Sequence, residues 1–139
     1  PPAAKLFRNC RPQDIYLATT KKAPRKRIAA YNKKGINVLV APGTNQVNLK
    51  WLWKELAKRE IAHLLIEGGA QMVGSALKAS LVDKMHVYVA PKILGDVNGL
   101  GSIAGLQTKK INQVFQLKEC AVQKIGKDYL FTGYVHRNR

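Results

Sequence analysis

The sequence predicts an α/β protein with a mixed sheet, in which parallel strands with crossover helices come first and an antiparallel hairpin ends the chain. Two observations support this prediction. Over residues 15–80, short and almost wholly apolar stretches alternate with helical patterns, as is typical of parallel strands joined by crossover helices. Residues 84–90 then alternate between apolar and polar side chains, and residues 114–125 and 128–135 meet at a Gly-Lys turn.

The first predicted strand, residues 15–19, follows a proline-containing lead-in loop over residues 1–14. Pro24 suits the first turn of a helix over residues 25–34, because the N–H that proline lacks would have no partner there. Gly35 is well suited to end that helix, since glycine readily adopts the left-handed conformation of a helix C-terminus.

The second predicted strand covers residues 36–41 and ends at Pro42-Gly43. Asn48 is a suitable N-cap for the helix that follows. Apolar side chains recur in that helix at i, i+3, i+4 and i+7, which gives one apolar face made of Leu49, Leu52, Trp53 and Leu56.

The third predicted strand, residues 61–66, is apolar enough to be covered on both faces of a sheet. Glu67 places a carboxylate at its C-terminal end, and Gly68 and Gly69 follow without a Cβ that would obstruct a ligand. A helix then extends to about Ser80. A junction of this kind directs free backbone N–H groups at a bound anion, and phosphate is the usual one.

Residues 95–110 contain four glycines and no periodic pattern, so we expect a long loop of the kind that is often functional or mobile.

The composition excludes disorder, since 46% of the residues are hydrophobic, and no apolar run approaches the 18 residues of a transmembrane helix. Cys10 and Cys120 stand alone, without a CxxC motif or a nearby histidine cluster. We therefore expect reduced thiols in a cytoplasmic protein, with no metal site and no membrane partner.

The net charge of +16, from 24 Lys and Arg against 8 Asp and Glu, is the most unusual feature of the composition. It fits nucleic acid, a membrane surface or small phosphorylated ligands. The densest basic run is residues 21–27, with Lys33 and Lys34 beyond it, and a solvated helix face beside a basic loop would also explain it. Aromatic side chains do not alternate with this run, which weakens the case for stacking of single-stranded nucleic acid.

In an open α/β sheet, ligands bind above the carboxyl ends of the strands. Those ends contain Thr19-Thr20-Lys21, residues 41–44 and residues 67–70, which together predict an anion-binding rim. The glycine spacing does not match GxGxxG, so an ordinary dinucleotide-binding site is not supported.

The candidate catalytic side chains each have a simpler explanation. Glu67 either accepts a hydrogen bond from a ligand or binds the backbone at the start of its own helix. His63 fits a core or interface histidine better than a catalytic one, and His86 and Tyr88 favour a surface or subunit contact. No Ser/His/Asp triad can be assembled from the sequence.

Several ordered motifs resemble the C-terminal reductase domain of the bifunctional riboflavin-biosynthesis deaminase/reductase. The resemblance spans most of residues 15–135. The matching motifs are Leu64-Leu-Ile-Glu-Gly-Gly-Ala70, Ser75-Ala-Leu, Leu81-Val-Asp83, Val89-Ala-Pro91, Ile93-Leu-Gly95 and the segment from Gly126-Lys-Asp128 to Gly133-Tyr-Val135.

The resemblance implies a dihydrofolate-reductase-like fold and an oxidoreductase that uses NADPH. Such an enzyme reduces the ribosylamino group of a pyrimidine 5′-phosphate to the ribitylamino form. The family also implies a homodimer and, in this fold class, a Gly68–Gly69 peptide that is often cis.

Carried over to matching positions, Glu67 would contact the substrate. Thr19, Thr20 and Lys21 would lie near the adenosine end of the cofactor. Backbone N–H groups at the helix start would wrap the NADPH phosphates, in a segment formed by Gly69, Ala70, Gln71, Met72, Val73, Gly74 and Ser75.

The chain departs from the family in two ways. Nothing before residue 15 matches the family's upstream strands, which contain a lysine- and serine-containing segment, or its zinc-deaminase domain. We therefore expect residues 1–139 to be an N-terminally truncated reductase domain and a poor reductase when isolated.

The charge also exceeds what NADPH and a sugar phosphate require. A basic nucleic-acid-binding module, or a structural dimerisation module on a degenerate reductase fold, is therefore an alternative.

Overall fold

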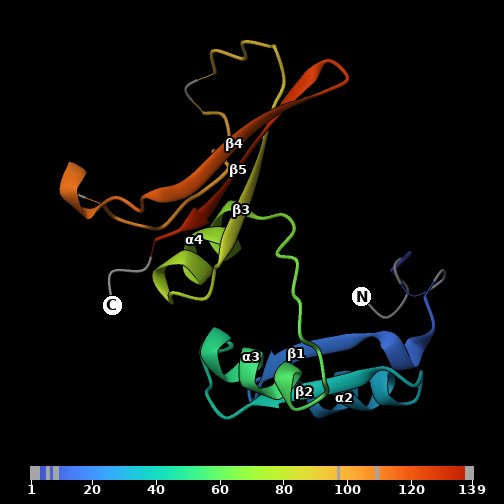
Figure 1. The fold of residues 1–139 in the computed structure, drawn as a ribbon. Coiled ribbons are helices and arrows are strands. Elements are labelled where there is room, and N and C mark those ends of the chain that lie inside the picture. Colours follow the sequence, from blue (N-terminus) through green and yellow to red (C-terminus); the bar gives the residue numbers. More distant parts are fainter. Residues whose placement is uncertain (1–3, 6, 8–9, 97, 109, 137–139) are drawn as a thin grey trace. The chain divides into compact units, whose positions relative to one another are not determined.

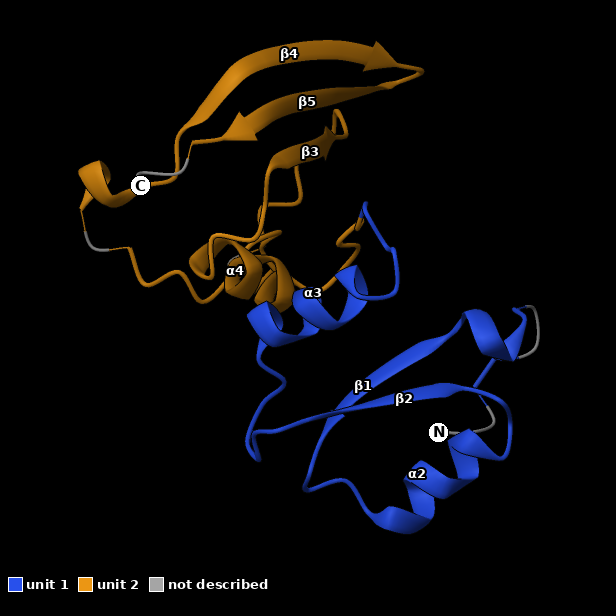
Figure 2. Cartoon of the chain, turned by 60° about the horizontal axis from the view of Figure 1, so that its bottom comes forward, with its two compact units in different colours: residues 1–63 blue, residues 64–139 orange. Residues whose placement is uncertain are grey.

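The computed structural model describes residues 4–5, 7, 10–96, 98–108 and 110–136, and the chain divides into two compact units (Figures 1 and 2). Unit 1 comprises residues 1–63 and unit 2 comprises residues 64–139. Unit 1 contains a parallel pair of strands, and unit 2 contains an antiparallel sheet of three strands. The predicted α/β class, with parallel strands first and an antiparallel hairpin last, is confirmed.

Unit 1 is built on two parallel strands, β1 and β2, with Thr20 opposite Ala41 at their carboxyl ends. Helix α2 connects the strands, and helix α3 follows β2 (Figure 1). The apolar core of the unit includes the buried side chains of Tyr31, Ile36 and Leu39. In chain order the elements are η1 (Pro12–Asp14), β1 (Tyr16–Thr20), α2 (Arg25–Asn32), β2 (Asn37–Ala41) and α3 (Leu49–Ala57).

The helix ends in unit 1 follow the local signals in the sequence. The N–H groups of Arg27 and Ile28 donate to the carbonyl oxygen of Pro24, which confirms this proline at the start of α2. The side-chain oxygen of Asn48 accepts a hydrogen bond from the N–H of Trp51 at 3.1 Å, so the predicted N-cap of α3 is also confirmed. Such a cap typically stabilises a helix by about 1 kcal/mol.

Glu55 is the centre of a small charge network at the end of α3. Its carboxylate accepts hydrogen bonds from Lys58 at 2.7 Å and from Arg59 at 3.0 Å. The guanidinium of Arg59 also lies 5.9 Å from the centroid of the Tyr16 ring, which links the end of α3 to β1. The hydrogen bonds from Lys58, and then from Arg59, hold the pKa of Glu55 below its ordinary value.

We expect the Glu55 carboxyl to titrate below the ordinary glutamate value of about 4.3 in the folded protein. Because this folded-state pKa is lowered, the network stabilises the fold above the unfolded pKa, and the contribution is lost as the pH falls through the folded pKa. Carboxyl NMR titration should show the Glu55 value rising in a Lys58→Ala/Arg59→Ala variant. Lys54→Ala is the control, since it removes a lysine of α3 that does not bond to Glu55; an unchanged titration in the double variant would contradict the assignment.

Unit 2 is an antiparallel sheet in the order β3-β5-β4, with helix α4 before the first strand. The predicted hairpin is confirmed: β4 and β5 meet at Gly126, which has a φ of 60°. The register of β4 shifts between Lys118 and Ala121, which marks a β-bulge. In chain order the elements are α4 (Ala70–Lys78), β3 (Lys84–Val89), η2 (Ile111–Gln113), β4 (Leu117–Ile125) and β5 (Asp128–Val135).

The burial pattern of β3 agrees with most of the predicted alternation. Met85 and Val87 are half-buried, whereas His86 and Tyr88 are exposed. Val89 was predicted on the face of Met85 and Val87, but it is exposed at the end of the strand. The predicted long loop is also present, because no helix or strand occurs between β3 and η2 in the part of the chain that is described there.

The predicted third strand over residues 61–66 is wrong. This segment belongs to no helix or strand, and it contains the boundary between the two units (Figure 1). Leu65 is 84% exposed, so the apolar run is not a buried one. Apolar residues indicate a preference for burial, but a strand forms only where a neighbouring strand satisfies its N–H and C=O groups. The parallel sheet therefore has two strands rather than three.

Candidate functional site

The glycine turn before α4 is the candidate site that the sequence singled out. Gly68 and Gly69 have φ angles of 76° and 74°, in the left-handed region that favours glycine. No peptide bond in the described residues is cis, so the Gly68–Gly69 peptide is trans. The cis peptide implied by the family resemblance is therefore wrong here, because the left-handed conformation of both glycines makes the turn with a trans bond.

The N-terminus of α4 has unused hydrogen-bond donors. Gly69 occupies the N-cap position and offers no side-chain cap, and its carbonyl oxygen accepts from the N–H groups of Met72 at 2.9 Å and Val73 at 3.1 Å. Within the described residues, the N–H groups of Ala70 and Gln71 donate to no acceptor. The first turn also has no acidic residue, so the positive end of the helix dipole is not neutralised. This end of α4 can therefore bind an anion.

Glu67 lies directly before this turn and is exposed. The sequence allowed two roles for the Glu67 carboxylate: a contact with a ligand, or a hydrogen bond to the backbone at the start of the following helix. No hydrogen bond between the Glu67 carboxylate and the described backbone is present, so the second alternative is not supported. The carboxylate is available to accept a hydrogen bond from a bound hydroxyl or N–H group.

Gly74 has a different environment from the exposed start of the helix. It is buried, and a Cβ at this position would overlap the carbonyl oxygen of Ala104. The N–H of Ala104 donates to the carbonyl oxygen of Ala70 at 3.1 Å, which ties the glycine-rich loop to the first turn of α4. The segment from Gly69 to Ser75 thus combines an exposed donor end with a buried packing position. Sequence reasoning missed Ala104; an isolated glycine in a helical pattern was the available signal.

The second predicted group, Thr19-Thr20-Lys21, lies at the carboxyl end of β1 in unit 1. The hydroxyl of Thr20 donates to the carbonyl oxygen of Thr44 at 3.1 Å, and the N–H of Lys21 donates to the carbonyl oxygen of Gly43 at 3.4 Å. These bonds join the ends of β1 and β2, so two of the three strand ends that were predicted to share a rim are neighbours. The third, residues 67–70, follows no strand.

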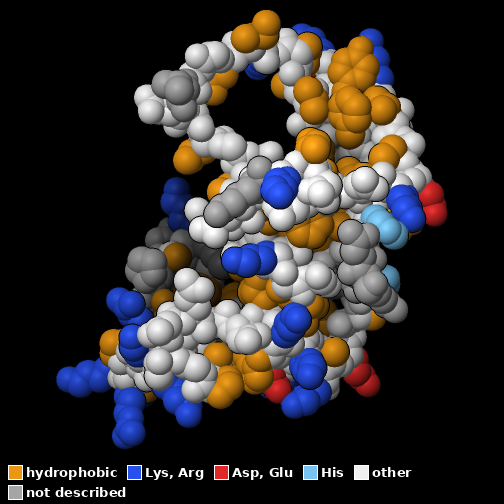
Figure 3. Space-filling view, turned by 90° about the vertical axis from the view of Figure 1, so that its left-hand side faces the viewer, with side chains coloured by type: hydrophobic (Ala, Val, Ile, Leu, Met, Phe, Trp, Pro, Cys, Tyr) orange, Lys and Arg blue, Asp and Glu red, His pale blue; other side chains and the backbone are white. Residues whose placement is uncertain are grey.

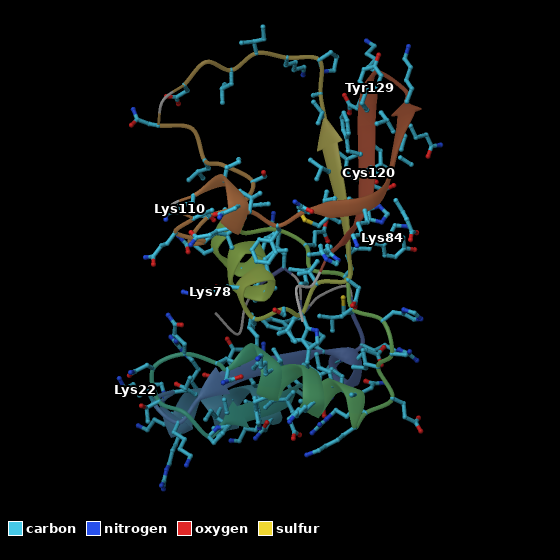
Figure 4. All side chains as sticks on the ribbon, turned by 60° about the vertical axis from the view of Figure 1, so that its left-hand side comes forward. Lys22, Lys78, Lys84, Lys110, Cys120 and Tyr129 are labelled. Carbon is cyan, nitrogen blue, oxygen red and sulfur yellow. The ribbon has the colours of Figure 1, made fainter. Side chains whose placement is uncertain are left out.

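The surroundings of this strand end are polar and basic. The ammonium of Lys22, which is labelled in Figure 4, donates to the side-chain oxygen of Asn45 at 2.9 Å. Lys21 is exposed, whereas Thr19 is half-buried beside it. The β1 group and the α4 turn belong to different units, and each forms a local structure of its own.

The other singled-out side chains show no catalytic grouping. His63 is exposed, so the core alternative is wrong, and the alternative of an interface histidine stays a prediction. Cys10 and Cys120 are free and exposed. Among the described residues, no three His, Cys, Asp or Glu side chains lie close enough together to hold a metal ion. In the same residues, no helix has both the length and the apolarity needed to cross a membrane.

Comparison with known proteins agrees with the resemblance seen in the sequence. The family model of the RibD C-terminal domain matches residues 1–131. The riboflavin biosynthesis protein RibD of Actinobacillus pleuropneumoniae is 34% identical over 106 residues, which is 76% of this chain and 28% of that protein. The 2,5-diamino-6-ribosylamino-4(3H)-pyrimidinone 5′-phosphate reductase of Aquifex aeolicus is 29% identical over 110 residues, which is 79% of this chain and 49% of that protein.

A solved structure supports the same fold. RibD of Acinetobacter baumannii is similar to this chain with a TM-score of 0.80 at 24% sequence identity, over 99% of this chain and 35% of that one. At this identity the likeness concerns the fold alone. The chain thus spans between about a quarter and a half of the length of the proteins it resembles.

Proposed function

The chain belongs to the RibD C-terminal domain family, and from this premise we propose that it serves as a reductase domain for a phosphorylated pyrimidine in riboflavin biosynthesis, with poor activity when isolated. The substrate would be a ribosylamino-pyrimidine 5′-phosphate, which the enzyme converts to the ribitylamino form. The reductant would be NADPH. A relative from Aquifex aeolicus whose name describes a reductase of such a compound supports this substrate class.

The observation that supports the proposal most directly is the uncapped, exposed start of α4 after two glycines. It fits a phosphate group for three reasons: two N–H donors without acceptors, the positive end of a helix dipole and no neighbouring carboxylate in the first turn. The absence of a Cβ at Gly68 and Gly69 lets a ligand approach the backbone closely.

Each residue would have a limited role in the reaction. NADPH, when bound, supplies the hydride. The N–H groups of Ala70 and Gln71 would bind a cofactor phosphate, and the ammonium of Lys21 would attract the anionic adenosine end. Glu67 would accept a hydrogen bond from the substrate and so orient the sugar. Positioning of this kind, together with exclusion of water, is the main contribution that a protein makes to hydride transfer.

We propose that the segment from Gly69 to Ser75 forms the phosphate site, with Thr19, Thr20 and Lys21 at the adenosine end. Within this segment, the free N–H groups favour Ala70 and Gln71 as direct donors. The segment's other members, Met72, Val73, Gly74 and Ser75, would hold the helix in place.

Amide NMR with the 139-residue chain tests the assignment. Titration with NADPH should shift the amide signals of Ala70 and Gln71, and those of Thr19 to Lys21, more than signals from the β4–β5 hairpin. Adenosine, which has no phosphate, serves as the control ligand and should leave Ala70 and Gln71 unchanged. The assignment fails if NADPH shifts other amides while these five residues stay unchanged.

A homodimer also stays a prediction. The exposed side chains of the unit 2 sheet include Tyr88 at 65%, Val122 at 58% and Phe131 at 44%, so this sheet has apolar surface that a second copy could cover. The predicted contact residues His86 and Tyr88 are both exposed and share one face of β3. Phe131 and Val122 align with Val87, so they lie on the opposite face of the sheet.

A further inference from the structure

The positive charge is concentrated in unit 1. This unit holds 14 of the 24 Lys and Arg residues but only 3 of the 8 Asp and Glu residues, a net charge of +11 within the total of +16. Figure 3 shows Lys and Arg side chains, in blue, on the surface of the molecule. Two of its three acids are already paired: Asp14 with Arg11 at 2.7 Å, and Glu55 with Lys58 and Arg59.

The densest charges form what we call the α2 basic cluster: Lys21, Arg25, Lys26, Arg27 and Lys33. All five side chains are exposed, and none forms an ion pair with another described residue. The helix has no acidic residue in its first turn. No acidic residue in the described part of the chain therefore neutralises the cluster.

The period of the helix places three of these charges on one face. Arg25, Lys26 and Lys33 lie on the side of α2 opposite Tyr31, which is buried in the core. Ala29 lies between them, and its short side chain leaves room for a ligand to approach the helix. Eight residues separate Arg25 from Lys33, so at about 1.5 Å per residue the charges extend over about 12 Å. A single phosphate group cannot contact charges spread over this length.

We propose that the outward face of α2 binds the phosphate backbone of double-stranded nucleic acid without sequence preference. A duplex has one negative charge per about 1.7 Å of its axis, so several phosphates match a 12 Å row of cations. A single strand fits less well, since this face has no aromatic side chain for base stacking. A membrane also fits less well, because Ile28 and Ala30 are half-buried and Tyr31 is buried, which leaves no large apolar side chain to insert.

The outward face of α2 shares no residue with the segment from Gly69 to Ser75 that we propose as the phosphate site. The test variant, Arg25→Gln/Lys26→Gln/Lys33→Gln, leaves Lys21 unchanged because Lys21 belongs to the proposed cofactor site. The control variant, Lys118→Gln/Lys124→Gln/Lys127→Gln, lowers the net charge by the same three units but in the β4–β5 hairpin of unit 2. Circular dichroism establishes that both variants are folded.

The experiment measures fluorescence anisotropy of a labelled duplex of scrambled sequence between 50 and 300 mM salt. Three phosphate contacts, one each from Arg25, Lys26 and Lys33, correspond to about −2.7 in the slope of log K against log salt, so the α2 variant should lose about this much of the slope of the unmodified chain. The control variant should keep a slope close to that of the unmodified chain.

Three outcomes would overturn the proposal. The unmodified chain could fail to bind the duplex at 50 mM salt. Both variants could weaken binding equally, which would mean that net charge alone is responsible. The α2 variant could lose binding to vesicles with anionic lipid but keep binding to the duplex, which would identify a membrane surface. None of these results depends on NADPH binding, so failure here leaves the proposed reductase function unaffected.

Discussion

Replacing Gly74 with alanine should destabilise unit 2 by about 1–3 kcal/mol, although alanine is normally the better residue inside a helix by about 0.5–1 kcal/mol. The reversed sign has a physical cause. The added Cβ would overlap the carbonyl oxygen of Ala104, which is backbone and cannot rotate away. Relieving the overlap would strain the hydrogen bond from the Ala104 N–H to the Ala70 carbonyl. Urea unfolding, followed by the signals of unit 2, measures the change in the free energy of unfolding.

Gly101→Ala is the matched control for this prediction. It lies in the same glycine-rich loop, and its added Cβ would meet only the carbonyl oxygen of Ile103, at an ordinary distance of 3.6 Å. This variant should change stability by less than about 0.5 kcal/mol, as is usual away from packed positions. If Gly74→Ala stabilises unit 2 as much as an exposed helix substitution does, the contact between α4 and the loop is not part of the folded protein.

Gly69→Asp should weaken NADPH binding by between tenfold and a hundredfold. An aspartate at an N-cap position accepts the free N–H groups of the first turn through its own carboxylate. Its negative charge also repels the phosphate that we place there. Each charge-assisted hydrogen bond lost corresponds to about 1.5–3 kcal/mol, which is consistent with this range. NADPH fluorescence titration gives the dissociation constants.

The control for this substitution is Gly126→Asp in the β4–β5 turn. Gly126 also has a positive φ, at 60°, and neither glycine has a neighbouring atom that an added Cβ would meet closer than 3.8 Å. The two variants therefore introduce the same charge and a similar backbone strain at different places. Equal NADPH affinity in Gly69→Asp and Gly126→Asp would exclude the start of α4 as the phosphate site.

Local signals in the sequence were sufficient to place most helices and strands. Asn48 and Pro24 mark helix starts because each acts on the backbone of its own first turn. Gly126 marks the hairpin because the turn needs a positive φ. The prediction of a strand over residues 61–66 was wrong because local signals do not decide it. Whether an apolar run becomes a strand depends on partner strands that are distant in the sequence.

The candidate site could be predicted in its composition but not in its contacts. Glu67 and the two glycines were identified from residue types alone, and the structure gives them an exposed turn before a helix. The contact of Gly74 with Ala104 joins residues that are 30 positions apart in the sequence, and the periodic pattern of apolar residues does not predict such a contact. The conformation of the Gly68–Gly69 peptide depends on the surrounding backbone, so the family resemblance implied the wrong isomer.

The β-bulge in β4 has a consequence for self-assembly into fibrils. In the order β3-β5-β4, strand β4 lies at the edge of its sheet and leaves a row of backbone N–H and C=O groups without a strand partner. Such an edge can pair with the same edge of another molecule and begin cross-β aggregation. The register shift between Lys118 and Ala121 interrupts the row, and the charge of Lys124 repels an identical edge. Removing both features should therefore promote amyloid-like stacking even though the fold of the unit is unchanged.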